Sequence, residues 1–529
     1  MDQGASLLGF DSVSGPGGVS SCASASIPYP TSLPSAEFLS VEAHLVTNYT
    51  VAIPPGFENS FAAPYSPLPV LNFCNVTLTH THPGLGDKIK TQVWLPLGDV
   101  DGDDSGGDTK PISGGSSPPS WNGRLQGVGG GDLSTGFIPL TQAHTCGEGY
   151  AVVTTDGGHD GADWGDVAWA LASADNVDWV AVQDAAVIGR AVTENFYDQK
   201  VQYAYFTGCS TGGRQAALLA QRWPGDYDGY LAGAASTCCH EIAAALAPQA
   251  HMVELGYAPP ACELRALRRL AIEQCDGLDG VVDGLVSEPG RCFDVFGPRA
   301  HVGDAFVCEE TGTTLKITEG GAEVARAAWE RLREADGDGV VWGGVGHQAD
   351  IAESRFSWAA TTCDYGDSDS AAPPQCKPKP WPLALAWVQY FLLQDPTPPP
   401  SPTAFFPSGQ RDLSRLVDQA RQWYTSILGT FDPDLSACGP AAANCCCRAL
   451  GNSRAYYAAV GARDPGGVDG YLRYFEAPGV AHCGIGDGDG NGSGHGLFPV
   501  RLLDVLRAWV EEGRAPDSVP AAAKKREGY

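Results

Sequence analysis

The hydrophobic and polar positions of residues 121–236 alternate between two kinds of pattern. Short apolar segments that end in glycine or aspartate are typical of buried strands, and they span 123–130, 150–156 and 201–208. Two other segments carry apolar residues at helical spacing, 178–197 and 214–223. Strands that alternate with helices predict a mostly parallel sheet covered on both faces, so we expect an α/β fold.

The pattern changes after residue 236. Residues 237–400 hold many of the cysteines and prolines and break the alternation, whereas a weak α/β pattern resumes near 415–480 and an amphipathic helix fits 501–513. A chain of 529 residues also exceeds what one core usually absorbs. We therefore predict a main α/β domain made of residues 1–236 and 401–529, with residues 237–400 inserted over its sheet as a lid.

The amino-acid composition argues against nucleic acid and membranes as partners of this protein. Acidic residues outnumber basic ones by 62 to 33, and the formal charge of −29 disfavours nucleic acid and anionic lipid as partners. No apolar run approaches the roughly 20 residues of a membrane-spanning helix. The oligomeric state stays open.

Cysteine usage indicates the compartment. Seventeen cysteines, together with sequons at Asn48, Asn75 and Asn491, favour a secreted glycoprotein with disulfide bonds. The odd count leaves at least one thiol unpaired or intermolecular. The first fifteen residues, MDQGASLLGFDSVSG, have neither the basic nor the apolar region of a signal peptide. We give the cysteines more weight and expect secretion, although no signal peptide is present in this sequence.

A candidate nucleophile lies between a predicted strand and a predicted helix. Residues 207–213 read T-G-C-S-T-G-G and contain the G-x-S-x-G pattern of a nucleophile elbow, with Ser210 at its centre. Flanking glycines permit the tight turn. The Thr211 N–H would then face a developing oxyanion at the start of a helix. The alternative is an ordinary Gly-rich turn in which the serine caps the helix.

A serine hydroxyl needs a general base. His482 stands late in the chain in a glycine-flanked loop, G-V-A-H-C-G, which suits the α/β-hydrolase order of serine, acid and histidine. The alternative is a histidine in a surface loop. Each candidate has a cysteine beside it, Cys209 before the serine and Cys483 after the histidine.

These motifs resemble the tannase and feruloyl esterase family over roughly residues 38–515. The resemblance rests on W-N-G-R at 121–124, the glycines 129–131, the partly matched G-G-H-D-G at 157–161 and A-P-G-V-A-H-C at 477–483. It implies an α/β-hydrolase with Ser210 as nucleophile, His482 as base and a Cys209–Cys483 disulfide that preorganises the pair. It also implies that Thr211 and Gly130 or Gly131 form the oxyanion hole.

The resemblance implies a calcium site in the lid. Residues 275–285, C-D-G-L-D-G-V-V-D-G-L, space three carboxylates along a turning loop, and hard cations bind such oxygen-rich loops. The implied ligands are the side chains of Asp276, Asp279 and Asp283 with the carbonyls of Val281 and Leu285. A disulfide between Cys275 and Cys292 would close the loop. From the residues alone, a cluster of Asp-Gly turns without a metal ion explains the pattern as well as a calcium site does.

The acid of the triad is missing from the pattern. After Asp434, the segment 438–455 replaces the family's strand and acid loop, and no Asp or Glu occurs until Asp464. We interpret this segment as a deletion or a mispredicted exon boundary that removes both a sheet strand and the acid, which orients the histidine. Asp464 and Asp469 are possible substitutes, although both are typical of surface turns.

Two functions follow. The first is a secreted carboxylic ester hydrolase that acts through a serine acyl-enzyme. The family resemblance implies that its substrate is an aromatic ester, feruloyl or galloyl, of a plant polysaccharide or polyphenol. The lid would form the acyl pocket, with Trp or Tyr side chains stacked on the ring. The second is a catalytically impaired relative that binds an aromatic or glycan ligand.

Overall fold

The structure is a computed structural model. It describes residues 22–28, 30, 33, 36–58, 60–64, 67–99, 118–159, 179–235, 240–330, 332–333, 340–352, 358–365, 374–397, 405–437, 443–448, 451–480, 482–485 and 496–522.

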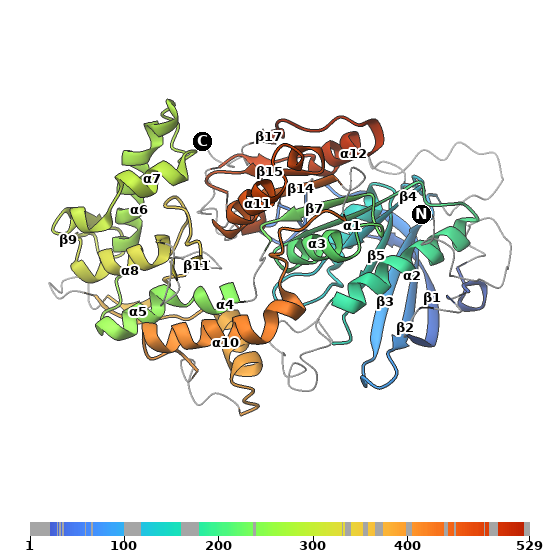
Figure 1. Cartoon of the computed structure of the whole chain (residues 1–529), viewed down its shortest axis with the longest axis horizontal. Coiled ribbons are helices and arrows are strands. Elements are labelled where there is room, and N and C mark those ends of the chain that lie inside the picture. Colours follow the sequence, from blue (N-terminus) through green and yellow to red (C-terminus); the bar gives the residue numbers. More distant parts are fainter. Residues whose placement is uncertain are drawn as a thin grey trace.

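A nine-stranded sheet forms the centre of one lobe (Figure 1). Its strands, in spatial order, are β1 (Glu37–Tyr49), β2 (Leu71–Thr81), β3 (Ile89–Pro96), β5 (Ala151–Thr155), β4 (Arg124–Val128), β6 (Tyr203–Cys209), β7 (Gly229–Gly233), β14 (Ala443–Arg448) and β15 (Leu472–Glu476). The strands from β5 to β15 run parallel, whereas β1, β2 and β3 join in antiparallel fashion. The predicted α/β sheet is confirmed.

Helices cover both faces of this sheet. Side chains of one strand alternate between the faces, so Phe206 packs with α2 (Trp179–Tyr197), α3 (Thr211–Arg222) and α11 (Gly451–Arg463). Its neighbour Tyr205 packs on the opposite face with α12 (Leu502–Glu512). Helix α1 (Pro139–Gly147) covers that same face nearer to β2 and β3.

A second lobe is mostly helical and has a core of its own (Figure 1). Trp329, Trp342 and Trp387 are fully buried within it. Its helices are α4 (His240–Ala244), α5 (Ala247–Leu255), α6 (Ala261–Cys275), α7 (Pro289–Val295), α8 (Glu319–Trp329), α9 (Pro382–Ala386), the π-helical turn η7 (Trp387–Leu392) and α10 (Gln410–Leu428). Three two-stranded sheets join them, β8 (Ala305–Cys308) with β9 (Thr313–Lys316), β10 (Leu332–Arg333) with β11 (Val340–Trp342), and β12 (Thr361–Asp364) with β13 (Gln375–Pro378).

The lid extends further along the chain than the sequence indicated. We placed residues from 401 onward in the main α/β domain, but the buried residues of α10, from Leu413 to Leu428, belong to the lid core. The reason is that α10 is amphipathic and packs its apolar face against α4, α5 and η7.

The predicted loss of a strand was wrong. Residues 443–448 form β14, which pairs in parallel with β7 on one side and β15 on the other. The segment has few residues that favour strands, so its conformation depends on the two strands that it joins. The sheet therefore has no gap at this position.

Disulfides join segments in both lobes. They are Cys22–Cys74, Cys209–Cys483, Cys262–Cys308, Cys275–Cys292 and Cys363–Cys376. The two predicted pairs are thus confirmed. The remaining short elements are η2 (Ser24–Ser26), η5 (Asp276–Asp279), η6 (Pro298–His301), η9 (Val468–Gly470), η10 (His482–Gly484), and the paired β16 (Phe498–Pro499) and β17 (Ala521–Ala522).

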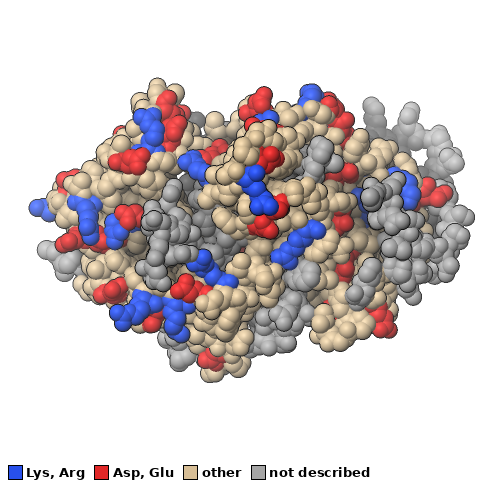
Figure 2. All heavy atoms as spheres, viewed as in Figure 1, with Lys and Arg blue, Asp and Glu red and all other residues tan. Residues whose placement is uncertain are grey.

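On the face shown in Figure 2, acidic and basic side chains are interspersed. Within the described ranges, no helix combines the length and apolar character needed to cross a membrane.

Candidate active site

Ser210 lies at a sharp turn between β6 and α3. Its backbone has φ 64° and ψ −119°, a conformation that non-glycine residues rarely adopt. The Ser210 N–H donates to the Gly233 carbonyl at 2.9 Å, and its own carbonyl accepts from the Arg214 N–H at 3.0 Å. These bonds hold the strained turn that a nucleophile elbow requires.

The glycine beside this turn is required for close approach. Strand β6 and the first turn of α3 come so near that a Cβ at Gly208 would overlap the backbone of Gly212. Glycine is the residue that fits where two backbones touch. The G-x-S-x-G pattern therefore corresponds to a real steric demand.

The glycine-rich loop after β4 packs directly against the elbow. The Gly212 N–H donates to the Gly130 carbonyl at 3.0 Å, and the Thr211 hydroxyl donates to the Asp132 carbonyl. The loop thus lies beside the start of α3, where the sequence predicts that the Thr211 N–H faces an oxyanion.

Gly130 cannot serve as an oxyanion donor in this arrangement, which corrects one of our two alternatives. Its N–H donates to the Gln215 side-chain oxygen at 3.0 Å. An N–H that is already bonded to a buried amide is not free to receive an oxyanion. Gly131 remains the candidate for the second donor.

Gln215 is a buried residue bonded to the glycine-rich loop, and the sequence did not reveal it. Its side chain is fully buried, and besides accepting from Gly130 it donates to the Thr135 carbonyl at 3.0 Å. His159 adds a further contact, since its Nε2 lies 3.0 Å from the Thr135 hydroxyl. The signal that could have identified Gln215 is its position on α3, five residues after Ser210, at a predicted core position that carries an amide.

His482 opens the short helical turn η10. Because Ser210 follows Cys209 and His482 precedes Cys483, the Cys209–Cys483 disulfide places the two candidates in the same region. The Cys483 carbonyl accepts a hydrogen bond from the Phe61 N–H at 2.9 Å, which fixes the histidine turn from another side. Both side chains are partly exposed, as a site open to substrate requires.

Asp464 and Asp469, the possible substitutes for the triad acid, lie near the amino ends of the strands, whereas Ser210 lies at the carboxyl ends. The register of β6, β7, β14 and β15 aligns Leu472 with Phe206, so Asp469 precedes the aligned region while Ser210 follows it. Asp464, which directly follows α11, lies still earlier in the chain. Four residues of strand separate Phe206 from Ser210, about 13 Å at the usual rise. Neither aspartate can therefore orient His482.

Within the described part of the sheet, the carboxylate-bearing residue Glu476 lies level with Ser210 by the strand register. It pairs in register with Arg448 at the carboxyl end of β15. Its carboxylate accepts from Arg454 Nε at 2.9 Å and from the Tyr474 hydroxyl at 2.6 Å. Sequence reasoning missed this residue because it lies in the strand before the histidine rather than in the preceding loop.

The W-N-G-R motif anchors β4 to α12. Arg124 donates through Nε to Glu511 Oε1 at 2.7 Å and through a terminal nitrogen to Oε2 at 2.6 Å. The Tyr205 hydroxyl donates to the same carboxylate at 2.8 Å. The hydrogen bond from Arg124 lowers the pKa of Glu511 to about 2, whereas burial opposes this shift.

The lid loop proposed for calcium is a series of tight turns. Asp276 is buried and accepts from the Asp283 and Gly284 N–H groups, both at 3.0 Å. Asp279 accepts from the Val281 N–H at 2.9 Å, and Asp283 accepts from the Leu285 N–H at 3.0 Å. Each of these bonds uses Oδ1, and carboxylate and carbonyl oxygens are donors of the kind that calcium binds. Among the described residues, however, these three carboxylates do not form a group whose oxygens lie within 4.8 Å of one another.

The lid tryptophans do not all meet the expected role in substrate binding. Trp329, Trp342 and Trp387 lie within the lid core and cannot stack on a bound ring. Trp358 and Trp381 pack only partly against that core, with ring centroids 5.4 Å apart. They remain candidates for an aromatic surface.

The parallel sheet, the strained serine at a strand-to-helix elbow and the histidine after the last strand define an α/β-hydrolase. Comparison with known proteins identifies the family. The profile of the family described as tannase and feruloyl esterase matches residues 115–368 and 444–529. The chain belongs to this family of carboxylic ester hydrolases.

Individual relatives agree with this assignment. A probable feruloyl esterase of Arthroderma benhamiae is 32% identical over 519 residues, which cover 94% of this chain and 86% of the relative. Feruloyl esterase B of Aspergillus niger is 29% identical, covering 76% of this chain and 75% of its own. The structure of the tannin acyl hydrolase from Aspergillus niger superposes with a TM-score of 0.76 at 23% identity, over 96% of this chain and 90% of that one. This last likeness supports the fold.

Proposed function

We propose that the protein hydrolyses aromatic carboxylic esters, with a feruloyl or galloyl acyl group, through a covalent acyl-enzyme on Ser210. The observation that carries the proposal is the Cys209–Cys483 disulfide, which joins the residue before Ser210 to the residue after His482. A covalent link between two loops that carry a nucleophile and a base reduces the entropy lost in bringing them together.

The reaction has two halves. In the first, His482 accepts the proton of Ser210 Oγ as this oxygen attacks the ester carbonyl, and the N–H groups of Thr211 and Gly131 stabilise the oxyanion. The C–O bond of the ester then breaks, and the alcohol leaves with the proton from His482. In the second half, His482 deprotonates a water molecule that attacks the acyl-enzyme, releasing the carboxylic acid and restoring Ser210.

The experiment compares variants on methyl ferulate, methyl gallate and a short-chain chromogenic ester. We expect Ser210→Ala to remove hydrolysis and labelling by a fluorophosphonate, and His482→Ala to reduce both by several orders of magnitude. Asp464→Asn and Asp469→Asn are matched controls, and both should keep the rate of the unmodified chain. Turnover that persists in Ser210→Ala would overturn the proposal.

A second candidate function is ligand binding without turnover. It is favoured by the absence of any Asp or Glu from residue 435 to residue 463, the stretch that holds the acid in the family pattern. Under this alternative the unmodified chain binds the aromatic acid but gives neither product nor fluorophosphonate label.

We also propose calcium as a structural ion of the lid loop, secretion into an oxidising compartment and glycosylation at the sequons. Five disulfides among the described residues support the compartment. Bound calcium would be held by Asp276, Asp279 and Asp283 with backbone carbonyls of Val281 and Leu285, and it would stabilise the loop without touching the ester.

A further inference from the structure

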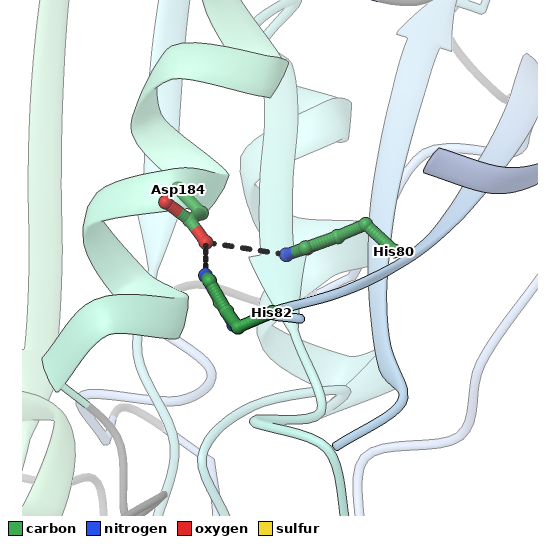
Figure 3. Close-up of side chains that lie close together, drawn as sticks. All are labelled: His80, His82 and Asp184. Carbon is green, nitrogen blue, oxygen red and sulfur yellow. Dashed lines mark hydrogen bonds and ion pairs between the residues drawn. The ribbon is translucent and has the colours of Figure 1, made fainter. Parts of the chain in front are cut away.

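A cluster of two histidines and an aspartate lies between the end of β2 and α2 (Figure 3). His80 is the second-last residue of β2 and His82 directly follows the strand, so the two side chains are two residues apart and point to the same side. Asp184 faces them from α2. All three side chains are buried.

The three side chains converge on one point. Asp184 Oδ2 lies 2.9 Å from His82 Nε2 and 3.3 Å from His80 Nε2. All three atoms lie within 4.8 Å of one another. In a tetrahedral zinc site with bonds of 2.0–2.2 Å, ligand atoms are about 3.3–3.5 Å apart. An ion could therefore enter with small movements of the side chains.

One of the histidine nitrogens lacks a properly directed partner. His82 Nε2 is close to Asp184 but makes no hydrogen bond of acceptable geometry with any described group. A buried polar nitrogen without a hydrogen bond is costly. A metal ion among the three side chains would supply the missing interaction.

Asp87 holds His82 in the orientation of a metal ligand. Its Oδ2 lies 2.6 Å from His82 Nδ1, and its Oδ1 accepts from the His82 N–H at 2.6 Å and the Thr81 hydroxyl at 2.9 Å. A carboxylate behind one ring nitrogen keeps the proton there and directs the lone pair of the other nitrogen forward. This arrangement accompanies most histidines that bind metals.

The charges also balance. With an ion bound, both imidazoles would be neutral ligands, and the carboxylates of Asp184 and Asp87 would face its positive charge. A dication would make the group neutral, which lowers the cost of burying its charges. Two imidazole nitrogens and one carboxylate oxygen suit a borderline transition metal better than calcium or magnesium.

From these contacts we propose that His80, His82 and Asp184 form a binding site for one zinc ion, with Asp87 as the residue that orients His82. The bound ion would link α2 to the end of β2. Strands β3, β5 and β4 separate β2 from β6, so the site lies about 19 Å across the sheet from the elbow. Its role is structural, and it does not touch the ester.

The test measures zinc in the purified full-length chain and titrates ZnCl2 by calorimetry, with calcium in excess to saturate the lid loop. We expect one zinc per chain. His82→Gln and Asp184→Asn should lose this binding, and Asp87→Asn should weaken it by about 10- to 100-fold. His44→Gln is the matched control, since His44 is exposed on the neighbouring strand β1 and should leave binding unchanged.

Cobalt provides a readout that needs no variant. Co²⁺ added to the unmodified chain should give visible absorption bands of a histidine-ligated ion, which ZnCl2 then removes. Absence of these bands, or zinc uptake equal in the unmodified chain and in His82→Gln, would overturn the proposal and leave the cluster as a proton-linked ion pair. Neither result depends on ester hydrolysis, so the test is independent of the proposed function.

Discussion

Single residues of the site divide into those that the sequence identifies and those that only packing reveals. Ser210 could be recognised because the glycines beside it are needed where two backbone segments touch, and all of these residues lie within seven positions of the sequence. Gln215 was not, because its amide bonds to a loop some 80 residues away. Local motifs can therefore be identified from the sequence, whereas contacts between residues far apart in the chain cannot.

Gln215→Ala should lower kcat while KM changes little. The substitution frees the Gly130 N–H and leaves the Thr135 carbonyl without its donor, so the oxyanion loop loses its fixed position, and a displacement of about 1 Å costs roughly 100-fold in rate. The measurement is steady-state hydrolysis of a short-chain chromogenic ester. Gln221→Ala, on the exposed side of the same helix, is the control and should keep full activity. An unchanged kcat in Gln215→Ala would remove Gln215 from the positioning role.

Glu511→Gln tests the anchor of α12. Since the folded-state pKa of Glu511 is about 2, below the ordinary value of 4.5, its ionic contribution is complete above about pH 4.5 and is lost as the pH falls through about 2. At pH 7 we expect a loss of about 1.5–3 kcal/mol in the free energy of unfolding. The difference from the unmodified chain should shrink between pH 4.5 and pH 2.

Urea unfolding at several pH values measures the loss in the free energy of unfolding at pH 7 and the change of this loss with pH. Glu512→Gln is the control, because Glu512 pairs with Arg514 on the surface and should change the free energy of unfolding by less than about 1 kcal/mol. A difference for Glu511→Gln that stays constant down to pH 2 would show that the carboxylate contributes through shape rather than charge.

At the level of elements, the sequence predicted those whose own pattern is strong. The segments 150–156, 178–197 and 201–208 correspond to β5, α2 and β6 within a few residues. Strand β14 was missed because residues 443–448 lack the β-branched and aromatic side chains that mark a strand. Its neighbours β7 and β15 impose its conformation, and single-segment patterns carry no information about neighbours.

The disulfide between the elbow and the histidine turn should affect catalysis and stability together. In Cys209→Ala/Cys483→Ala the two loops are no longer tied, so we expect kcat to fall at least 10-fold and the free energy of unfolding to fall by about 2–4 kcal/mol. The control is Cys363→Ala/Cys376→Ala, which opens a hairpin of the lid and should leave kcat unchanged. A double variant at 209 and 483 with full activity would show that other contacts suffice to position His482.

At the scale of the whole molecule, the two-lobed plan could be predicted from the sequence, but the boundary between the lobes could not. The break after residue 236 was visible as a change of pattern. The return to the main α/β domain was not, because α10 looks like any amphipathic helix and its partner face depends on the tertiary structure. The missing triad acid also could not be settled from the sequence, because only the strand register excludes Asp464 and Asp469 as partners of His482.

Calcium should stabilise the lid lobe as a unit. The loop 276–285 follows α6, is closed by the Cys275–Cys292 disulfide and is tied to the lid by Gln348, which donates to the Gly284 carbonyl at 2.8 Å. An ion that binds only the folded loop at 100 times its Kd adds about 2.7 kcal/mol, so calcium should raise the Tm of the lid transition by several degrees. Differential scanning calorimetry with and without calcium measures the shift. Asp276→Asn should abolish the shift, and Asp294→Asn, at an exposed position on α7, should retain it. If the shift persists in Asp276→Asn, the ion binds elsewhere and the loop is a set of Asp-Gly turns.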